Sequence, residues 1–229
     1  MATERDRARH DLHPYPARLL VNIPTFFLST SLTKPGDLVV DPFCGSGTVL
    51  LEAVQAGRDA VGADANPLAH LIARVKVGSI NEKHVKRALA RLSEPAKEPQ
   101  GDFPDVVNLE YWFYPHVRSS LVSLLRRIER IREDSTRDIL RLAFSASVKE
   151  VSLADPRLSV PVRLRRDQYP SGHWLHQKTN ARLARLRHID VKRCALSNRS
   201  GETPFAIDAG HCGANRIAGE PRLGETIQV

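Results

Sequence analysis

The chain has 229 residues and a formal net charge of +8, which is long enough for one ordinary domain with a buried core. No apolar run approaches the roughly 18 residues that cross a membrane, and the charged N-terminus MATERDRARH lacks the apolar stretch of a signal peptide. The cysteines Cys44, Cys194 and Cys212 are odd in number and widely spaced, which disfavours a disulfide framework. We therefore expect a cytoplasmic protein.

The segment before the first strand is expected to form an extended N-terminal arm. Residues 10–28 contain Pro14, Pro16 and Pro24, which keep the first part extended, and Phe26 to Leu28 begin an apolar helical face. A turn follows and leads into the first strand. The plain interpretation is an N-terminal arm packed on a sheet.

Residues 38–69 contain the pattern around which the rest of the chain is organised. Two short apolar runs, 38–40 and 60–63, are each followed by an aspartate, and they flank a glycine turn and a helix that begins at Thr48 and stops at Gly57. Gly45 and Gly47 allow a tight turn that a ligand can approach closely. An acid about 20 residues after such glycines can bind the two hydroxyls of a ribose. This spacing is typical of a strand–turn–helix–strand unit that binds a nucleoside.

The residues of this unit resemble a known family. The string DPFCGSGT is similar to motif I of S-adenosylmethionine (SAM) dependent methyltransferases, especially those that methylate exocyclic amino groups of nucleic-acid bases, and GADANPLA is similar to their second motif. The dinucleotide fingerprint differs, because it has a third glycine that this loop lacks. The resemblance implies SAM as cofactor, Asp64 as the ribose-binding acid, and a cofactor site made of Asp41, Pro42, Phe43, Cys44, Gly45, Ser46, Gly47, Thr48, Asp64, Ala65 and Asn66.

The arm resembles the family as well. Its pattern H-x-Y-P-A-R-L is similar to the segment that precedes motif I in DNA amino-methyltransferases, so the resemblance implies that Tyr15, Pro16 and Ala17 line the cofactor pocket. The implied fold class is α/β, a partial Rossmann-like SAM methyltransferase sheet with a helical insertion and a basic C-terminal segment. The expected divisions are 1–79 for cofactor binding, 80–154 for the insertion, 155–196 for nucleic-acid contact, and 197–229 as a flexible tail.

The middle of the chain is expected to be helical. Asn66 is a suitable N-cap with Pro67 at the first helical position, and this helix ends near Gly78. Further helices are predicted over 83–92, from Val117 to residue 132, and from Ile139 onward. The aromatic cluster 111–115 is interpreted either as core or as a wall beside a flipped target base.

The excess positive charge lies between residues 157 and 199, which contain eleven lysines and arginines but only two aspartates. Aromatic residues among cations suit phosphate contact and base stacking. We predict nucleic-acid contacts from Arg163, Arg165, Arg166, Tyr169, Trp174, Lys178, Arg182 and Arg185. A zinc site is disfavoured although His173, His176, Cys194, His211 and Cys212 are present, because no paired C-x-x-C spacing supports one, and we predict no metal.

One element of the resembling family is missing. Its enzymes use a tetrapeptide, Asp/Asn/Ser-Pro-Pro-aromatic, to bind the target amine, and no such tetrapeptide occurs in this sequence. The catalytic residues are therefore unknown, and we expect a partial enzyme completed by a second polypeptide or by a longer product. Cys44 lies in the glycine turn rather than in a catalytic Pro-Cys element, which disfavours carbon-5 methylation of cytosine.

Three functions remain open from the sequence. The resemblance favours DNA amino-methylation at adenine N6 or cytosine N4, as in restriction-modification, by an active, truncated or inactive copy. A tRNA base amino-methyltransferase and a catalytically silent module that binds SAM and nucleic acid are the alternatives. The target base and the recognition sequence are not encoded in any motif.

Overall fold

A computed structural model describes residues 9–16, 18–94, 107–158, 160–191 and 226–228. These residues divide into two compact units, one drawn from residues 9–82, 133–142 and 226–228 and the other from 83–132 and 143–191. Each unit is described by itself. The sequence predicts separate insertion and basic segments, whereas in the structure most residues of both belong to the second unit.

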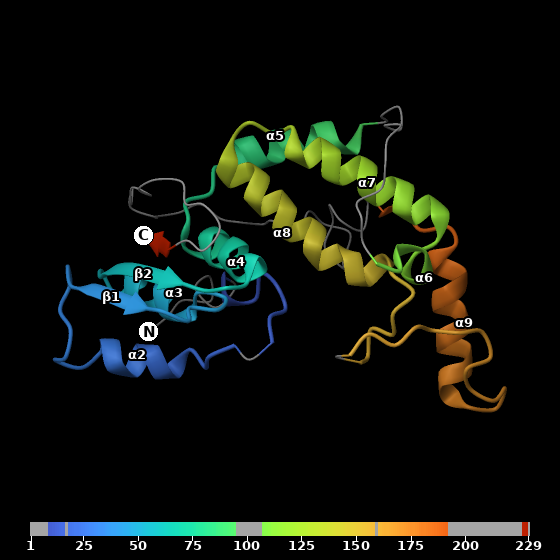
Figure 1. The fold of residues 1–229 in the computed structure, drawn as a ribbon, viewed down its shortest axis with the longest axis horizontal. Helices are drawn as coiled ribbons and strands as arrows, with labels where there is room; N and C mark the ends of the chain where they lie inside the picture. The colour runs from blue at the N-terminus through green and yellow to red at the C-terminus, as the bar shows by residue number, and fades with distance from the viewer. Residues whose placement is uncertain (1–8, 17, 95–106, 159, 192–225, 229) are drawn as a thin grey trace. The chain divides into compact units, whose positions relative to one another are not determined.

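The first unit is built on the predicted strand–turn–helix–strand pattern (Figure 1). Strands β1 (Leu38–Asp41) and β2 (Asp59–Ala63) are parallel, with Leu38 opposite Asp59 and Asp41 opposite Gly62. Strand β3 (Thr226–Gln228) pairs antiparallel with β2, so the sheet order is β1-β2-β3. These three residues of the predicted tail are therefore paired in the sheet, and the rest of that tail lies outside the described residues.

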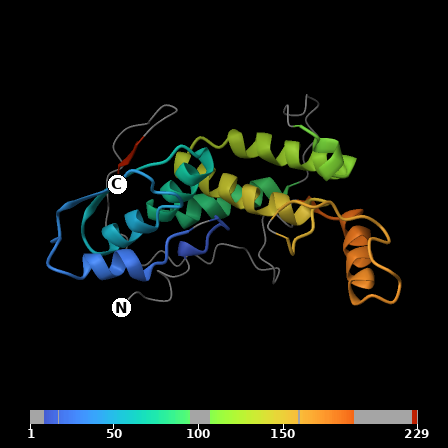
Figure 2. The same ribbon diagram turned by 60° about the horizontal axis from the view of Figure 1, so that its bottom comes forward.

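Three helices, together with residues 133–142, complete the described part of the first unit. Helix α2 (Asn22–Leu28) contacts α3 (Thr48–Gln55), as Figure 2 shows, and α3 contacts both parallel strands and α4 (Pro67–Val77). The core between them contains Leu28, Leu50, Leu51, Ala53, Ala60, Ala73 and Val77. Asn66 caps α4, with Pro67 at its start and Gly78 at its end, as the sequence predicts.

One face of this sheet is open among the described residues. Val39 packs toward α3, while Leu38 and Val40 on the opposite face are 58% and 62% exposed. Phe26 and Phe27 of α2 are also more than half exposed. Parallel strands are usually covered on both faces, so this apolar surface is unusual for such a sheet.

The second unit is helical. It contains α5 (Glu82–Ser93), α6 (Leu109–Trp112), α7 (Pro115–Glu129), the second half of α8 (Asp134–Val151) and α9 (Trp174–Leu186). Its cores join residues far apart in sequence: Val117 and Leu121 pack with Val151 and Val191, and Leu153 and Leu164 pack with Leu183 and Leu186. The basic segment is thus packed into the helical unit. In the described part of the chain, no helix is both long and apolar enough to cross a membrane.

Candidate functional site

The glycine loop between β1 and α3 is held by its own backbone. The Phe43 N–H donates to Asp41 Oδ1 at 3.1 Å, which closes a side-chain-to-backbone turn. The Cys44 N–H donates to the Ala63 carbonyl at 2.9 Å, and the Gly47 N–H donates to the Cys44 carbonyl at 2.8 Å. The loop is therefore attached to the end of β2, where Asp64 follows.

Gly47 is required by packing as well as by conformation. Its φ is +73°, and a Cβ added there would lie 2.8 Å from the Cβ of Ala73 in α4. Any side chain at this position would therefore push α4 away from the loop. Close contact between α3 and α4 depends on this glycine.

The Asp64 carboxylate joins the two loops. Its Oδ2 accepts the Gly45 N–H at 2.9 Å, and its Oδ1 accepts the Asn66 N–H at 2.9 Å. Each oxygen of a carboxylate can accept more than one hydrogen bond, so both can still accept one from a ligand hydroxyl. Asp64 is half-buried, which leaves it accessible for such a contact.

The predicted arm residues lie beside this carboxylate. Asn66 Nδ2 donates to the Tyr15 hydroxyl at 3.4 Å, and the Tyr15 ring would be 3.6 Å from a Cβ built on Gly45. The structure thus brings Tyr15, Gly45, Asp64 and Asn66 together. Ala65 and Pro16 are exposed, and Ala17 lies outside the described residues.

The loop retains a backbone donor for a ligand. Among the described residues, nothing accepts a hydrogen bond from the Ser46 N–H, and no side chain caps the N-terminus of α3. Free N–H groups at the start of a helix bind acceptor atoms. Together with Asp64, these donors fit a nucleoside-type cofactor that carries both hydroxyl donors and acceptor atoms.

Two predicted cofactor residues have side chains that point elsewhere. Cys44 is 5% exposed and faces the core, with its Cβ 2.8 Å and its Sγ 2.9 Å from a Cβ built on Gly62. Burial, reinforced by Asp41 and Asp64, raises the pKa of the Cys44 thiol to about 11. Thr48 is 3% exposed. Both side chains are buried, so the prediction that Cys44 and Thr48 take part in a cofactor site concerns their backbones and stays a prediction. Phe43, in contrast, is 87% exposed and extends from the loop.

Sequence reasoning missed Lys76. Its side chain on α4 is fully buried, and Nζ donates to Ser46 Oγ at 3.3 Å. Burial, and then the nearby Arg18, lower the pKa of Lys76 to about 8, although Asp11 acts in the opposite direction. The only signal in the sequence is a lysine between two valines near the end of the helix, which is ordinarily interpreted as a solvent-facing position.

The arm is also attached through a buried polar cluster that the sequence did not reveal. His10 Nε2 lies 2.9 Å from Glu52 Oε1, and Thr25 Oγ1 donates to Glu52 Oε2 at 2.7 Å. His10 and Glu52 are 5% and 6% exposed. This cluster fixes the arm and α2 to α3.

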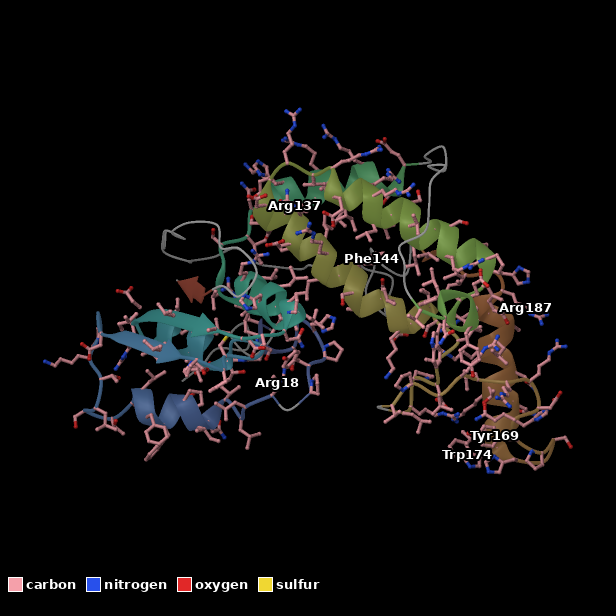
Figure 3. The ribbon with its side chains drawn as sticks, viewed as in Figure 1. Arg18, Arg137, Phe144, Tyr169, Trp174 and Arg187 are labelled. Carbon is pink, nitrogen blue, oxygen red and sulfur yellow. The ribbon has the colours of Figure 1, made fainter. Side chains whose placement is uncertain are left out.

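The second unit carries a column of stacked rings and cations. Arg157 lies over the Tyr169 ring at 5.6 Å, Tyr169 stacks on His173 at 5.0 Å, and His173 stacks on Trp174 at 6.0 Å. Lys178 Nζ lies 5.0 Å from the centre of the Trp174 ring. Figure 3 shows Tyr169 and Trp174 together near the start of α9, with Arg187 at the other end of that helix. We call these five residues the aromatic column.

The predicted nucleic-acid residues fall into two groups. The residues of the first group are exposed, and Trp174 among them is 66% exposed. This group consists of Arg165, Arg166, Trp174, Lys178 and Arg185. Arg163 instead stacks on the Tyr111 ring at 4.6 Å, and Arg182 donates to the Glu150 carbonyl at 3.1 Å. Burial lowers the pKa of Arg182. Both of these arginines make contacts within the second unit, and their contact with nucleic acid stays a prediction.

The second unit also has a cavity of about 310 Å³, lined by Arg166, Asp167, Asn180, Leu183, Ala184 and Arg187. Phe113 and Tyr114 of the aromatic cluster pack against the core of the second unit. Cys194, His211 and Cys212 lie outside the described residues, and the part of the chain that is described contains no group of three His, Cys, Asp or Glu side chains suited to a metal.

The first unit is an α/β unit with a glycine loop after its first strand, and comparison with known proteins narrows the class of protein. Residues 3–74 match the model of the N6/N4 methyltransferase family, described as DNA methylase. The chain is 30% identical to Type II methyltransferase M.MvaI of Kocuria varians over 162 residues, which is 66% of this chain and 36% of that protein. It is 33% identical to Type II methyltransferase M.MjaII of Methanocaldococcus jannaschii over 95 residues, 42% of this chain and 18% of that protein.

A further relative is Type II methyltransferase M.BsoBI of Geobacillus stearothermophilus, with 29% identity over 126 residues, or 43% of this chain and 25% of that protein. No solved structure matches. The chain thus spans about a third or less of the length of these relatives. Its resemblance to N6/N4 DNA amino-methyltransferases is confirmed over this part of their length.

Proposed function

We propose that this chain provides the SAM-binding part of a DNA amino-methyltransferase that acts on adenine N6 or cytosine N4, with its sheet forming part of a Rossmann-like methyltransferase fold. The observation that carries the proposal is the Asp64 carboxylate, which binds the Gly45 N–H at 2.9 Å beside Tyr15 while keeping acceptor capacity for a ribose. The match of residues 3–74 to the DNA methylase family supports it.

The proposed role of each residue follows from its contacts. Asp64 accepts the hydroxyls of the ribose, the Ser46 N–H and the uncapped start of α3 donate to acceptor atoms of the cofactor, and Tyr15 closes the pocket over Gly45. SAM supplies an activated methyl group on a cationic sulfonium. The protein then has to hold that methyl in line with the target amine and exclude water.

The aromatic column is proposed to contact DNA. Exposed Trp174 offers a face for stacking, and Lys178 and the exposed arginines neutralise phosphates. A base that is methylated on its exocyclic amine must first leave the helical stack, and aromatic side chains lower the free energy of the unstacked state. DNA is therefore the proposed macromolecular substrate.

A second polypeptide is proposed to complete the enzyme. The outer edge of β1 has no strand partner among the described residues, and the face formed by Leu38 and Val40 is exposed. A second polypeptide, or further residues of a longer product, could pair this edge with added strands, cover this face with other elements and supply the Pro-Pro-aromatic motif that this sequence lacks. The amine-binding step would then take place on the partner.

Two measurements test the proposal together. Calorimetry with SAM is expected to give saturable binding by this chain, and transfer of a labelled methyl group is expected with DNA but not with tRNA once the completing polypeptide is present. Binding without transfer to either nucleic acid by that completed enzyme would instead favour a silent SAM-binding module. Transfer to tRNA would favour the RNA enzyme, and absence of SAM binding by the folded protein would remove all of these functions.

A further inference from the structure

Lys76 is the largest side chain in the described residues that is completely buried. An ammonium group has three N–H donors. Among the described residues, Ser46 Oγ at 3.3 Å is the only acceptor of a hydrogen bond from Lys76 Nζ, and no carboxylate there forms an ion pair with it. A buried cation with so few partners strongly opposes folding, and an apolar side chain would fill the same space more favourably.

The single partner of Lys76 lies at the centre of the cofactor loop. Ser46 sits in the bend closed by the bond from the Gly47 N–H to the Cys44 carbonyl, and its own N–H is the donor left for a ligand. Ser46 is only 4% exposed, so its hydroxyl points into the protein rather than toward a ligand. Lys76 therefore holds the loop from the core side, opposite the side that a cofactor approaches.

We propose that Lys76 is a positioning residue for the cofactor loop: by donating to the Ser46 hydroxyl, its ammonium group keeps the bend from Cys44 to Gly47 in the conformation that binds SAM. This inference rests on the proposed function and deepens it. Lys76 makes no contact with the cofactor in this scheme. It acts through Ser46, and the retained charge is explained by the stronger hydrogen bond that an ammonium group makes.

The groups around Lys76 determine how this contact responds to pH. Arg18 and Asp11 of the arm act on its charge in opposite directions, and Arg9 donates to the Lys76 backbone carbonyl at 3.1 Å. Glu52 of α3 is bound by His10 and Thr25 and forms no ion pair with Lys76. Because the Lys76 pKa is lowered to about 8, the group loses its proton between pH 7 and pH 9, and the bond to Ser46 weakens.

The inference is tested by calorimetry with SAM at pH 7 and pH 9 on the wild-type protein and three variants. Lys76→Met and Ser46→Ala should each weaken SAM binding about tenfold at pH 7, the equivalent of one charge-assisted hydrogen bond. Lys34→Met removes an exposed lysine of the same unit and should leave affinity unchanged. Wild-type affinity should fall severalfold from pH 7 to pH 9, whereas that of Lys76→Met should not. Affinity of Lys76→Met within twofold of wild type at pH 7 would overturn the inference.

A ligand-free measurement separates this inference from the proposed function. In ¹⁵N-labelled wild-type protein, the amide resonances of Gly45 and Gly47 should shift with a midpoint near pH 8, and this shift should disappear in Lys76→Met. If wild-type protein fails to bind SAM, the proposed function fails, and the glycine resonances still decide whether Lys76 controls the loop. Glycine resonances that do not change between pH 7 and pH 9 would overturn the inference even if SAM binds.

Discussion

Replacing Lys76 with methionine should stabilise the fold at neutral pH. The pKa of Lys76 falls from its ordinary 10.5 to about 8, and each pKa unit corresponds to about 1.4 kcal/mol, so burial of the charged form costs about 3 kcal/mol. Methionine is also unbranched and flexible, and it can fill the space without a charge. The variant loses the hydrogen bond to Ser46, worth about 1.5 kcal/mol. The expected net gain in free energy of unfolding is therefore about 2 kcal/mol at pH 7.

The pH dependence of the free energy of unfolding tests independently whether the buried charge of Lys76 destabilises the fold. Below pH 8 both the native and the unfolded chain carry the Lys76 proton, so the full destabilisation is present. Between pH 8 and pH 10.5 the unfolded chain binds the proton that the native state has released, so wild-type stability rises with pH through this window. The advantage of Lys76→Met should therefore shrink as pH rises.

Urea unfolding at pH 7 and pH 9.5 measures both quantities, with Lys34→Met as the control that should match wild type at each pH. A Lys76→Met protein less stable than wild type at pH 7, or one whose advantage is the same at both pH values, would refute the reasoning. A stable variant that binds SAM poorly would show that this lysine is retained for function at the expense of stability.

Three further predictions concern single residues. Gly47→Ala should reduce the free energy of unfolding by about 3 kcal/mol in urea titration, since it adds a close contact with α4 to the strain of positive φ. Gly36→Ala, at φ +88° with open space around it, should reduce it by only about 1 kcal/mol. Equal losses would contradict the packing role of Gly47. Cys44 is buried and its pKa is raised to about 11, so it should not react with a thiol reagent at pH 8 in the native protein. The measurement uses a variant whose other two cysteines are replaced by serine. Rapid labelling without denaturant would be inconsistent with the burial of Cys44. In DNA-binding titrations over a range of salt, Trp174→Ala should weaken affinity with an unchanged salt slope, while Lys178→Ala should reduce the slope by about one; unaltered binding in both variants would argue against the aromatic column.

The sequence predicted those parts of the fold that local physics determines. Strands β1 and β2, the helix between them and the Asn66 cap are each encoded within a few residues, by apolar runs, turn glycines and a side chain that binds a nearby N–H. The contact between Gly45 and Asp64 could also be predicted from the sequence, because parallel strands bring their carboxyl ends together.

The remainder depends on contacts between residues distant in sequence. A lysine at position 76 and an arginine at position 182 carry no local sign of whether they face solvent or the core, and only tertiary packing turns them inward. Likewise, the Cys44 side chain faces Gly62 only because the glycine loop packs against β2. The grouping of the basic segment with the helices arises from Val191, whose partners Val117 and Leu121 lie far earlier in the chain.

The central claim is that Asp64 and the glycine loop form a SAM site, and calorimetry with SAM on matched aspartate variants tests it most directly. Wild-type protein should bind SAM saturably, and Asp64→Ala should weaken that binding at least tenfold, because it removes the acceptor for the ribose and for the Gly45 N–H. Asp59→Ala, which changes an exposed aspartate at the start of β2, should bind like wild type. Undiminished binding by Asp64→Ala, or no binding by folded wild-type protein, would contradict the claim.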